Sequence, residues 1–162
     1  MSQALIIEAL RTPRGRGNDK GALRSLKPVD LLARQLKALA QQTGIDTAQV
    51  SDAIIGCVTQ TADQGANIAK LALVRAGWSD QVPGLSINRY CASGLSAVQM
   101  AADRIRLGEA DVMIAAGVES MSMVPMMGNA PSLSPAMFGN DDNIGIAYGM
   151  GLTAEKVATQ WK

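Results

Sequence analysis

The sequence predicts an α/β fold with a mostly parallel sheet and helices on both of its faces. Short apolar runs that are typical of buried strands alternate with longer stretches of helical spacing, which is the pattern of successive strand-helix-strand units. Parallel strands that are covered on both faces tend to be continuously apolar, as these runs are. The length of 162 residues, 48% of them hydrophobic, suits an ordinary globular domain.

Four short runs predict strands, at residues 3–10, 52–58, 82–88 and 111–116. The first, QALIIEAL, is expected to be a buried strand because it is apolar, contains two isoleucines and stops at Arg11-Thr12-Pro13. Pro83 and Gly84 weaken the beginning of the third strand. Gly117 closes the fourth.

Helical spacing predicts four helices between and after these strands. The strongest follows Pro28, where leucines recur at helical spacing until Gly44, the expected C-terminal cap. The second covers 66–77 and also ends in glycine, the third runs from Cys91 to Gly108, and the fourth covers 153–162.

The third predicted helix suggests that a further layer of structure covers it. Residues 91–102 contain no charged side chain, and a helix that is apolar on all sides is expected to be buried on all sides. One sheet covers only one side of a helix. The sequence also stops at Lys162 inside a helical pattern, so we expect the second layer on a missing remainder of the polypeptide or on another chain.

Composition excludes several classes of function. The formal net charge is +1, and the basic residues near the start are diluted by acidic ones and not interleaved with aromatic rings, so nucleic acid is not an expected partner. No apolar run approaches the roughly 20 residues that a membrane-spanning helix needs. The adjacent Asp141 and Asp142 lack the spacing of a calcium loop, and no metal site is expected.

The sequence contains no histidine, so a Ser-His-Asp triad, a histidine-assisted cysteine or a histidine-containing zinc site cannot be assembled within it. Its two cysteines, Cys57 and Cys91, are far apart and form no CxxC pair. The first residues do not show the charged and then apolar pattern of a secretory signal. We therefore expect two free thiols in a reducing, cytoplasmic compartment.

Cys91 is the candidate catalytic residue. It follows a predicted strand and a short turn, and it is expected in the first turn of a helix, where unpaired backbone N–H groups and the helix dipole favour a nucleophilic thiolate. The small residues Ala92, Ser93 and Gly94 would let a ligand or a second helix approach closely. From the spacing alone, a buried structural thiol remains the alternative.

The segment from Ser86 to Ser122 resembles the nucleophile region of the thiolase family. Members carry Asn-x-x-Cys-x-Ser-Gly at the start of a buried helix, and then a strand that ends in Gly-x-Glu-Ser-Met-Ser. The matching residues are Asn88, Cys91, Ser93, Gly94, Gly117, Glu119, Ser120, Met121 and Ser122. The segments EALRTPRGRG, IIGCVTQ and MGLTAEKVA are also similar to thiolase segments and occur in the same order.

This resemblance implies a thiolase-like layered fold, of which the chain is one half of a duplicated unit. Residues 1–118 would be the amino-terminal α/β domain with the nucleophile, and 119–162 the start of the substrate-binding loop domain. The latter contains six of the nine methionines, which are Met121, Met123, Met126, Met127, Met137 and Met150. Met150 matches a methionine of the family's substrate pocket.

The implied activity is acyl transfer between coenzyme A thioesters, with no other cofactor. The Cys91 thiolate would attack a 3-ketoacyl-CoA, release acetyl-CoA and pass the acyl group to a second CoA, or run the reverse condensation. The backbone N–H of Cys91 is expected to stabilise the oxyanion formed during attack. Whole thiolases are typically homo-oligomers.

The departures from the family pattern limit these expectations. The second half of a thiolase supplies a Gly-His-Pro histidine and a Cys-x-Gly cysteine, and neither motif is present here, so the chain alone is expected to be inactive. Cys57 lies in the second predicted strand and is interpreted as core packing. Gly149 stands where several acetoacetyl-specific members have histidine, which leaves the acyl chain length open.

Two alternatives remain at this stage. The chain could belong to a ketoacyl-synthase-like condensing enzyme within the same superfamily, although the Glu119-Ser120-Met121-Ser122 string favours a thiolase. It could also be a non-catalytic half that scaffolds a partner or binds acyl-CoA.

Overall fold

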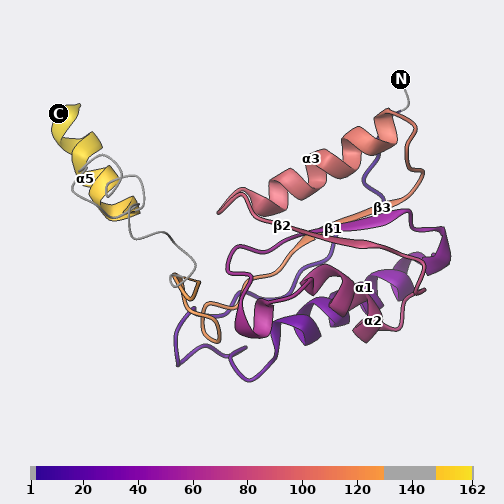
Figure 1. The fold of residues 1–162 in the computed structure, drawn as a ribbon, viewed down its shortest axis with the longest axis horizontal. Helices are drawn as coiled ribbons and strands as arrows, with labels where there is room; N and C mark the ends of the chain where they lie inside the picture. Colours follow the sequence, from indigo (N-terminus) through magenta and orange to yellow (C-terminus); the bar gives the residue numbers. More distant parts are fainter. Residues whose placement is uncertain (1–2, 130–148, 162) are drawn as a thin grey trace. The chain divides into compact units, whose positions relative to one another are not determined.

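A computed structural model describes residues 3–129 and 149–161 of the chain. The chain divides into two compact units, 1–128 and 129–162. The first unit contains a sheet with helices on both faces, and the described part of the second contains helix α5 (Met150–Gln160) (Figure 1).

The sheet of the first unit has three strands within the described residues, in the order β2-β1-β3, and all are parallel. They are β1 (Asp52–Gly56), β2 (Gly84–Ile87) and β3 (Met113–Gly117). The register pairs Gly56 with both Ile87 and Gly117, so all three strands end at the same level. The second, third and fourth predicted strands are confirmed, with ends that differ by at most two residues from the prediction.

Helices cover both faces of the sheet, as predicted. Helices α1 (Pro28–Thr43) and α2 (Ile68–Ala76) lie on one face, and α3 (Ser93–Arg106) lies on the other (Figure 1). Gly44 and Gly77 terminate the first two in the left-handed conformation, with φ of 67° and 74°. Two short 3₁₀ helices, η1 (Thr47–Gln49) and η2 (Ala62–Gln64), precede and follow β1 in the sequence.

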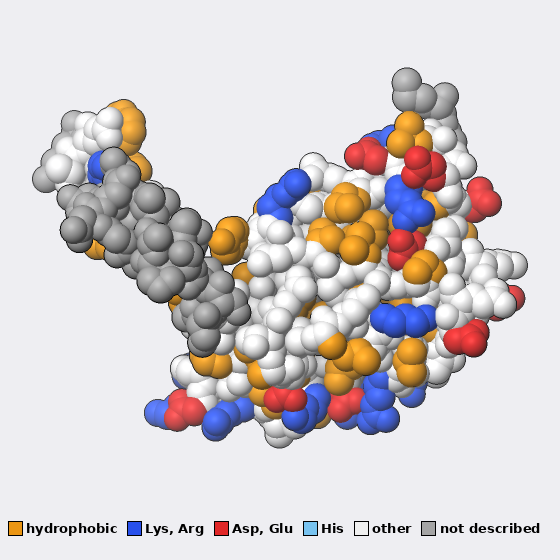
Figure 2. Space-filling model, viewed as in Figure 1, with side chains coloured by type: hydrophobic (Ala, Val, Ile, Leu, Met, Phe, Trp, Pro, Cys, Tyr) orange, Lys and Arg blue, Asp and Glu red, His pale blue; other side chains and the backbone are white. Residues whose placement is uncertain are grey.

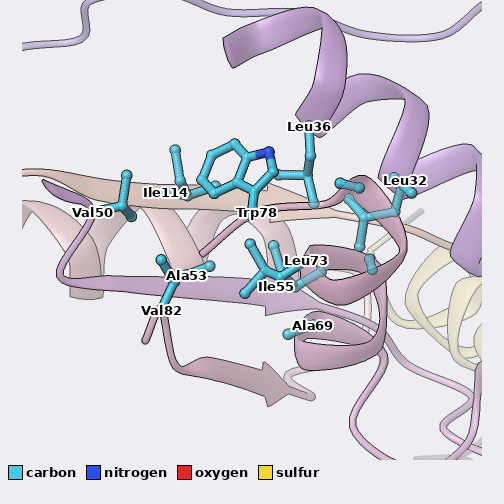
Figure 3. Close-up of a cluster of buried hydrophobic side chains, with 13 residues drawn as sticks. Leu32, Leu36, Val50, Ala53, Ile55, Ala69, Leu73, Trp78, Val82 and Ile114 are labelled. Carbon is cyan, nitrogen blue, oxygen red and sulfur yellow. The ribbon is translucent and has the colours of Figure 1, made fainter. Parts of the chain in front are cut away.

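The main hydrophobic core lies between the sheet and the α1/α2 layer (Figure 3). Ala53 and Ile55 of β1 belong to this core, whereas Ile54 alternates to the α3 side, and all three are fully buried. Trp78 follows α2 and packs in the same cluster as Leu36 and Ile114. The central strand is therefore buried on both faces, as its apolar sequence indicated.

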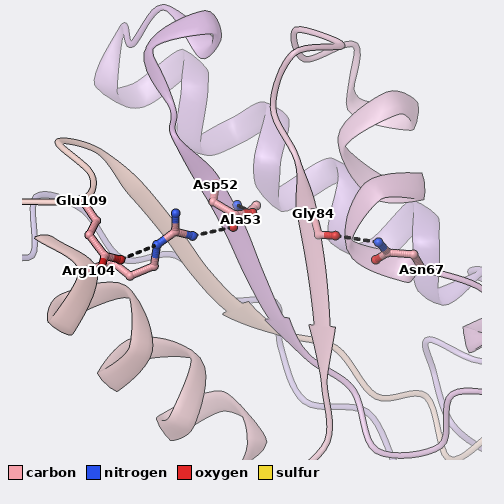
Figure 4. A network of polar contacts seen from close by, with 6 residues as sticks. All are labelled: Asp52, Ala53, Asn67, Gly84, Arg104 and Glu109. Carbon is pink, nitrogen blue, oxygen red and sulfur yellow. Dashed lines mark hydrogen bonds and ion pairs between the residues drawn. The ribbon is translucent and has the colours of Figure 1, made fainter.

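Polar contacts connect the helices to the strands (Figure 4). Arg104 near the end of α3 donates to Asp52 at the start of β1 over 2.7 Å, and Glu109 lies 3.7 Å from the same guanidinium. The Asn67 amide donates to the Gly84 carbonyl of β2 over 2.6 Å, and its oxygen caps α2 by accepting from Lys70 N–H.

The first predicted strand is wrong. Residues 3–10 form no strand, and Leu5, Ile6 and Ile7 are 65–81% exposed. A strand exists only where a neighbour satisfies its backbone N–H and C=O groups, and no described segment pairs with this one. Apolar composition indicates that a segment is suited to burial, but it cannot supply the partner.

Among the described residues, the sheet covers one side of helix α3, and the charge-free part of this helix, up to Ala102, also has apolar side chains on the other side. Ser93, Ser96, Ala97 and Ala101 are buried against the sheet. Leu95 and Val98 are 63% and 42% exposed on the other side, and exposed hydrophobic side chains are visible on the surface of the first unit (Figure 2). None of the described helices is long and apolar enough to cross a membrane.

Candidate functional site

The carboxyl ends of the three strands form one edge of the sheet, because Gly56, Ile87 and Gly117 lie side by side. The loops that follow β1, β2 and β3 all leave from this edge. In open α/β sheets, ligands bind outside the carboxyl ends of the strands. The edge is therefore where the candidate residues are expected to converge.

Cys91 lies at this edge, in a segment that we call the nucleophile turn, residues 88–93. Cys91 is exposed to solvent, whereas Cys57 is buried. The prediction that Cys91 occupies the first turn of the helix is wrong, because α3 begins at Ser93, two positions later. The first helical hydrogen bond of α3 runs from Ser96 N–H to the Ala92 carbonyl, which leaves Cys91 in the preceding turn, next to Tyr90, whose φ of 47° is left-handed.

Two polar side chains hold the nucleophile turn in this conformation. The Asn88 oxygen accepts from Tyr90 N–H over 2.8 Å, and the Ser93 hydroxyl accepts from Arg89 N–H over 2.8 Å and donates to the Tyr90 carbonyl over 2.6 Å. A left-handed residue with a side chain costs roughly 1–2 kcal/mol. These three hydrogen bonds offset that cost and present Cys91 at the surface.

The start of α3 packs directly against the end of β1, where Gly56 permits a close approach. A Cβ atom on Gly56 would lie 2.7 Å from the Ser93 carbonyl carbon and 2.8 Å from Gly94 N. A Cβ on Gly117, at the end of β3, would lie 3.8 Å from the Gly94 Cα, which is an ordinary van der Waals distance. The nucleophile turn can thus lie close to the sheet because Gly56 has no side chain.

The second cysteine is unsuited to acid or base chemistry. Cys57 is 1% exposed, and burial together with the negative charge of Glu119 raises its pKa from the ordinary 9.0 to about 12. Its thiol is therefore protonated at neutral pH. The interpretation of Cys57 as a core residue agrees with its burial.

Met150, the other predicted site residue, is the first residue of α5 in the second unit and is 63% exposed. Met137, Asp141 and Asp142 lie outside the described residues. Within 3–129 and 149–161, no group of three or more acidic or cysteine side chains is arranged to hold a metal ion.

A comparison with known families now identifies the chain. The family model described as thiolase, N-terminal domain, matches residues 4–162. The chain belongs to the thiolase family. It is 40% identical to the 3-ketoacyl-CoA thiolase of Bacillus subtilis over 99% of its own length and 40% of the relative's. It is 38% identical to the β-ketoadipyl-CoA thiolase of Pseudomonas knackmussii over 99% of the chain and 36% of that protein.

Solved structures give the same result for the fold of this thiolase chain. The crystal structure of the Bacillus anthracis acetyl-CoA acetyltransferase matches with a TM-score of 0.59 and 38% identity, over 64% of this chain and 26% of that one. The chain spans about 40% of the length of the first of the curated relatives named above.

The two parts of the thiolase motif, around Cys91 and around Glu119, lie at the same edge of the sheet. Asn88, Cys91 and Ser93 form the turn that follows β2, while Gly117 ends β3 and Glu119 follows it at the same edge. Sequence reasoning missed Gln64, which is fully buried beneath these loops. Its surroundings, TADQG, resemble an ordinary polar turn, so no local signal distinguishes it.

Proposed function

We propose that the polypeptide containing these residues is a thiolase-type acyltransferase in which Cys91 carries the acyl group. In the cleavage direction, the Cys91 thiolate adds to the keto carbonyl of a 3-ketoacyl-CoA. The carbon–carbon bond breaks, and the released carbanion is protonated to acetyl-CoA. The acyl-cysteine thioester is then attacked by the thiolate of a second CoA, which restores Cys91. The reverse sequence condenses two acyl-CoA molecules.

The observation that carries this proposal is the exposed thiol of Cys91 on a constrained turn at the carboxyl edge of the sheet. Cys57 offers no competing nucleophile, because it is buried and its pKa is raised to about 12. In the proposed mechanism, the backbone N–H of Cys91 donates to the oxyanion formed during attack.

We propose that the proton acceptor for Cys91 is a histidine from outside these 162 residues, which include none. We therefore propose that the second half of a thiolase, which brings the histidine and a second cysteine, completes the site. Without a general base, roughly two to four powers of ten in rate are lost. The 162-residue chain alone is expected to be inactive.

Substrate binding is assigned to the second part of the chain. In this proposal, the functional boundary follows residue 118, and 119–162 begin the loop domain that receives the pantetheine and acyl tail. Met150 would contact this tail, which is supported by its exposure and by the apolar neighbours Leu152 and Val157 on α5, which are also exposed. CoA thioesters are the substrates, and no further cofactor is proposed.

We also propose a cytoplasmic homo-oligomer. The two cysteines are free, which suits a reducing compartment. The exposed Leu95 and Val98 on the outer side of α3 favour association, because contiguous apolar surface is usually covered in a stable assembly. Light scattering tests this directly, and a monodisperse monomer of the complete polypeptide would contradict the oligomer.

The decisive experiment compares two cysteine variants of the polypeptide that contains this chain. Cys91→Ala is expected to lower acetyl-CoA release from a 3-ketoacyl-CoA and CoA by about three powers of ten or more, whereas Cys57→Ala retains most activity. Intact mass spectrometry of the protein trapped during turnover should place one acyl group on Cys91. An acyl adduct at another side chain, or equal turnover by Cys91→Ala, would refute the proposal.

A further inference from the structure

The Glu119 carboxylate binds the loop that follows β1 through a set of three donors. Its Oε2 accepts from Val58 N–H over 2.7 Å, and its Oε1 accepts from Thr59 N–H over 3.3 Å and from the Gln64 amide over 2.7 Å. We call this arrangement the Glu119 clamp. Hydrogen bonds to an ionised acceptor are among the strongest in proteins, so the clamp connects the loop after β3 firmly to the loop after β1.

Gln64 supports the Glu119 clamp from the interior of the protein. It is fully buried, and the same amide nitrogen that donates to Glu119 also donates to the Thr59 carbonyl over 3.0 Å. Its amide oxygen accepts from Ser120 N–H over 2.5 Å. Both ends of the Gln64 side chain are therefore engaged, and the Glu119 side chain has little freedom to rotate.

The clamp reaches the nucleophile turn through one peptide group. The peptide between Val58 and Thr59 gives its N–H to Glu119, while its carbonyl accepts from the Asn88 amide over 3.2 Å. The Asn88 oxygen in turn accepts from Tyr90 N–H, next to Cys91. A continuous series of hydrogen bonds therefore runs from the Glu119 carboxylate to the residue that precedes the nucleophile.

The turn needs such support because Tyr90 is held in a left-handed conformation that a side chain disfavours. Ser93 supports the turn from its helical end. Asn88 supports it from the strand end, and the direction of the Asn88 side chain depends on where the Val58 carbonyl points.

We infer that Glu119 is a positioning residue for Cys91, acting through the Val58–Thr59 peptide and Asn88. The inference rests on the proposed function of Cys91. Glu119 does not take part in proton transfer in this role, because its oxygens are occupied by the three N–H donors. Its effect is to hold the thiol in the direction from which it attacks the keto carbonyl of a bound 3-ketoacyl-CoA.

The test uses Glu119→Gln in the polypeptide that contains this chain. The amide keeps the shape of the side chain but replaces one acceptor oxygen with a donor, which faces the N–H groups of the clamp. Glu109→Gln is the matched control, because it is the same substitution at a 59% exposed side chain whose neighbour is Arg104, after α3.

Three readouts separate positioning from a loss of folding. We expect kcat for acyl transfer to fall about 10–100-fold with KM changed by less than about twofold, because misdirection of the nucleophile slows chemistry more than binding. Labelling with iodoacetamide, which needs no oriented attack, should stay within about threefold of the wild type. Cys57 should remain unlabelled, since only unfolding exposes it.

Hydrogen exchange at the Tyr90 amide supplies a measurement that does not depend on activity. We expect Glu119→Gln to accelerate exchange by about tenfold, and Glu109→Gln to leave it unchanged. Asn88→Ala should reproduce the acceleration, and the double variant Asn88→Ala/Glu119→Gln should be no faster, because both changes interrupt one series of bonds.

The outcomes separate this inference from the proposed function. If the wild type transfers acyl groups and Glu119→Gln changes neither kcat nor Tyr90 exchange, the positioning role is overturned. A fall in kcat accompanied by labelling of Cys57 would also overturn it in favour of a purely structural role. If the wild type shows no acyl transfer but exchange responds as expected, the proposed function fails while the connection from Glu119 to the turn stands.

Discussion

Gly56 and Ser93 are in direct backbone contact, although 36 other residues separate them in the sequence. Gly56 ends β1 and Ser93 begins α3, and a Cβ on Gly56 would lie 2.7 Å from the Ser93 carbonyl carbon. The end of the nucleophile turn therefore packs against the backbone of Gly56, at the end of the central strand. This contact determines how close Cys91 lies to the loops that follow β1 and β3.

Gly56→Ala is expected to destabilise the chain because the new methyl group must displace the backbone of α3. Overpacking of this kind costs about 1–3 kcal/mol in the free energy of unfolding, measured by urea denaturation. Gly94→Ala is the matched control. A Cβ there meets no atom within 4 Å, and alanine favours a helix, so stability should stay the same or rise by up to about 1 kcal/mol. Equal losses in the two variants would contradict the packing argument.

The two cysteines should react very differently with a small alkylating reagent. At about pH 8, iodoacetamide is expected to modify Cys91, which is exposed, and to leave buried Cys57 intact. Peptide mapping by mass spectrometry identifies the modified residue. Cys91→Ala should take up no label until urea is added, and rapid labelling of Cys57 under native conditions would contradict the structure.

Stability should decline at alkaline pH because of Cys57. Burial, with Glu119 nearby, raises the pKa of the folded thiol to about 12, while the unfolded thiol titrates near the ordinary 9.0. The unfolded state therefore releases its proton first. This contribution to stability is fully present below pH 9 and falls by up to about 1.4 kcal/mol per pH unit as the pH rises towards 12.

The control for this pH dependence is Cys57→Ala, which lacks the titrating thiol. Its free energy of unfolding should be lower at neutral pH, because the substitution leaves a cavity, but it should decline less steeply above pH 9. Urea denaturation of both proteins between about pH 8 and pH 10.5 gives the two slopes. Identical slopes would show that Cys57 does not contribute.

The core between α1 and the sheet can be probed with one substitution at two leucines. Leu36 is 2% exposed within the core cluster, so Leu36→Ala should cost about 2–5 kcal/mol in the free energy of unfolding. Leu107 is 73% exposed at the end of α3, and Leu107→Ala should change stability by less than about 0.5 kcal/mol. A comparable loss at Leu107 would indicate that another part of the protein covers this end of α3.

Local patterns predicted most of the elements correctly because they report backbone preferences. Pro28 and Gly44 mark the beginning and end of α1, and Gly77 marks the end of α2. The apolar run of β1 correctly indicated a strand buried on both faces. The motif around Cys91 also located the candidate nucleophile, since the residues that carry it lie within a single short segment.

The errors and omissions concern partners that lie far away in the sequence. Residues 3–10 are apolar but form no strand, because no described neighbour pairs with them. The start of α3 was misplaced by two residues, because the side chains of Asn88 and Ser93 bond the backbone of Arg89 and Tyr90 and hold Cys91 in a turn before the helix. The contact of Glu119 with Val58 joins residues 61 positions apart, and no local pattern encodes it.

The amino-acid sequence alone was thus sufficient for the order of the three strands and the helices, for the ends of α1 and α2, and for naming Cys91 as the candidate nucleophile. These follow from hydrophobic spacing and from the conformational preferences of proline and glycine, which act over a few residues. Tertiary structure decided which thiol is exposed and how the nucleophile turn is supported. The hydrogen bonds from Gln64 to Glu119 and from Asn88 to the Val58 carbonyl arise only when parallel strands bring the ends of three distant loops to one edge.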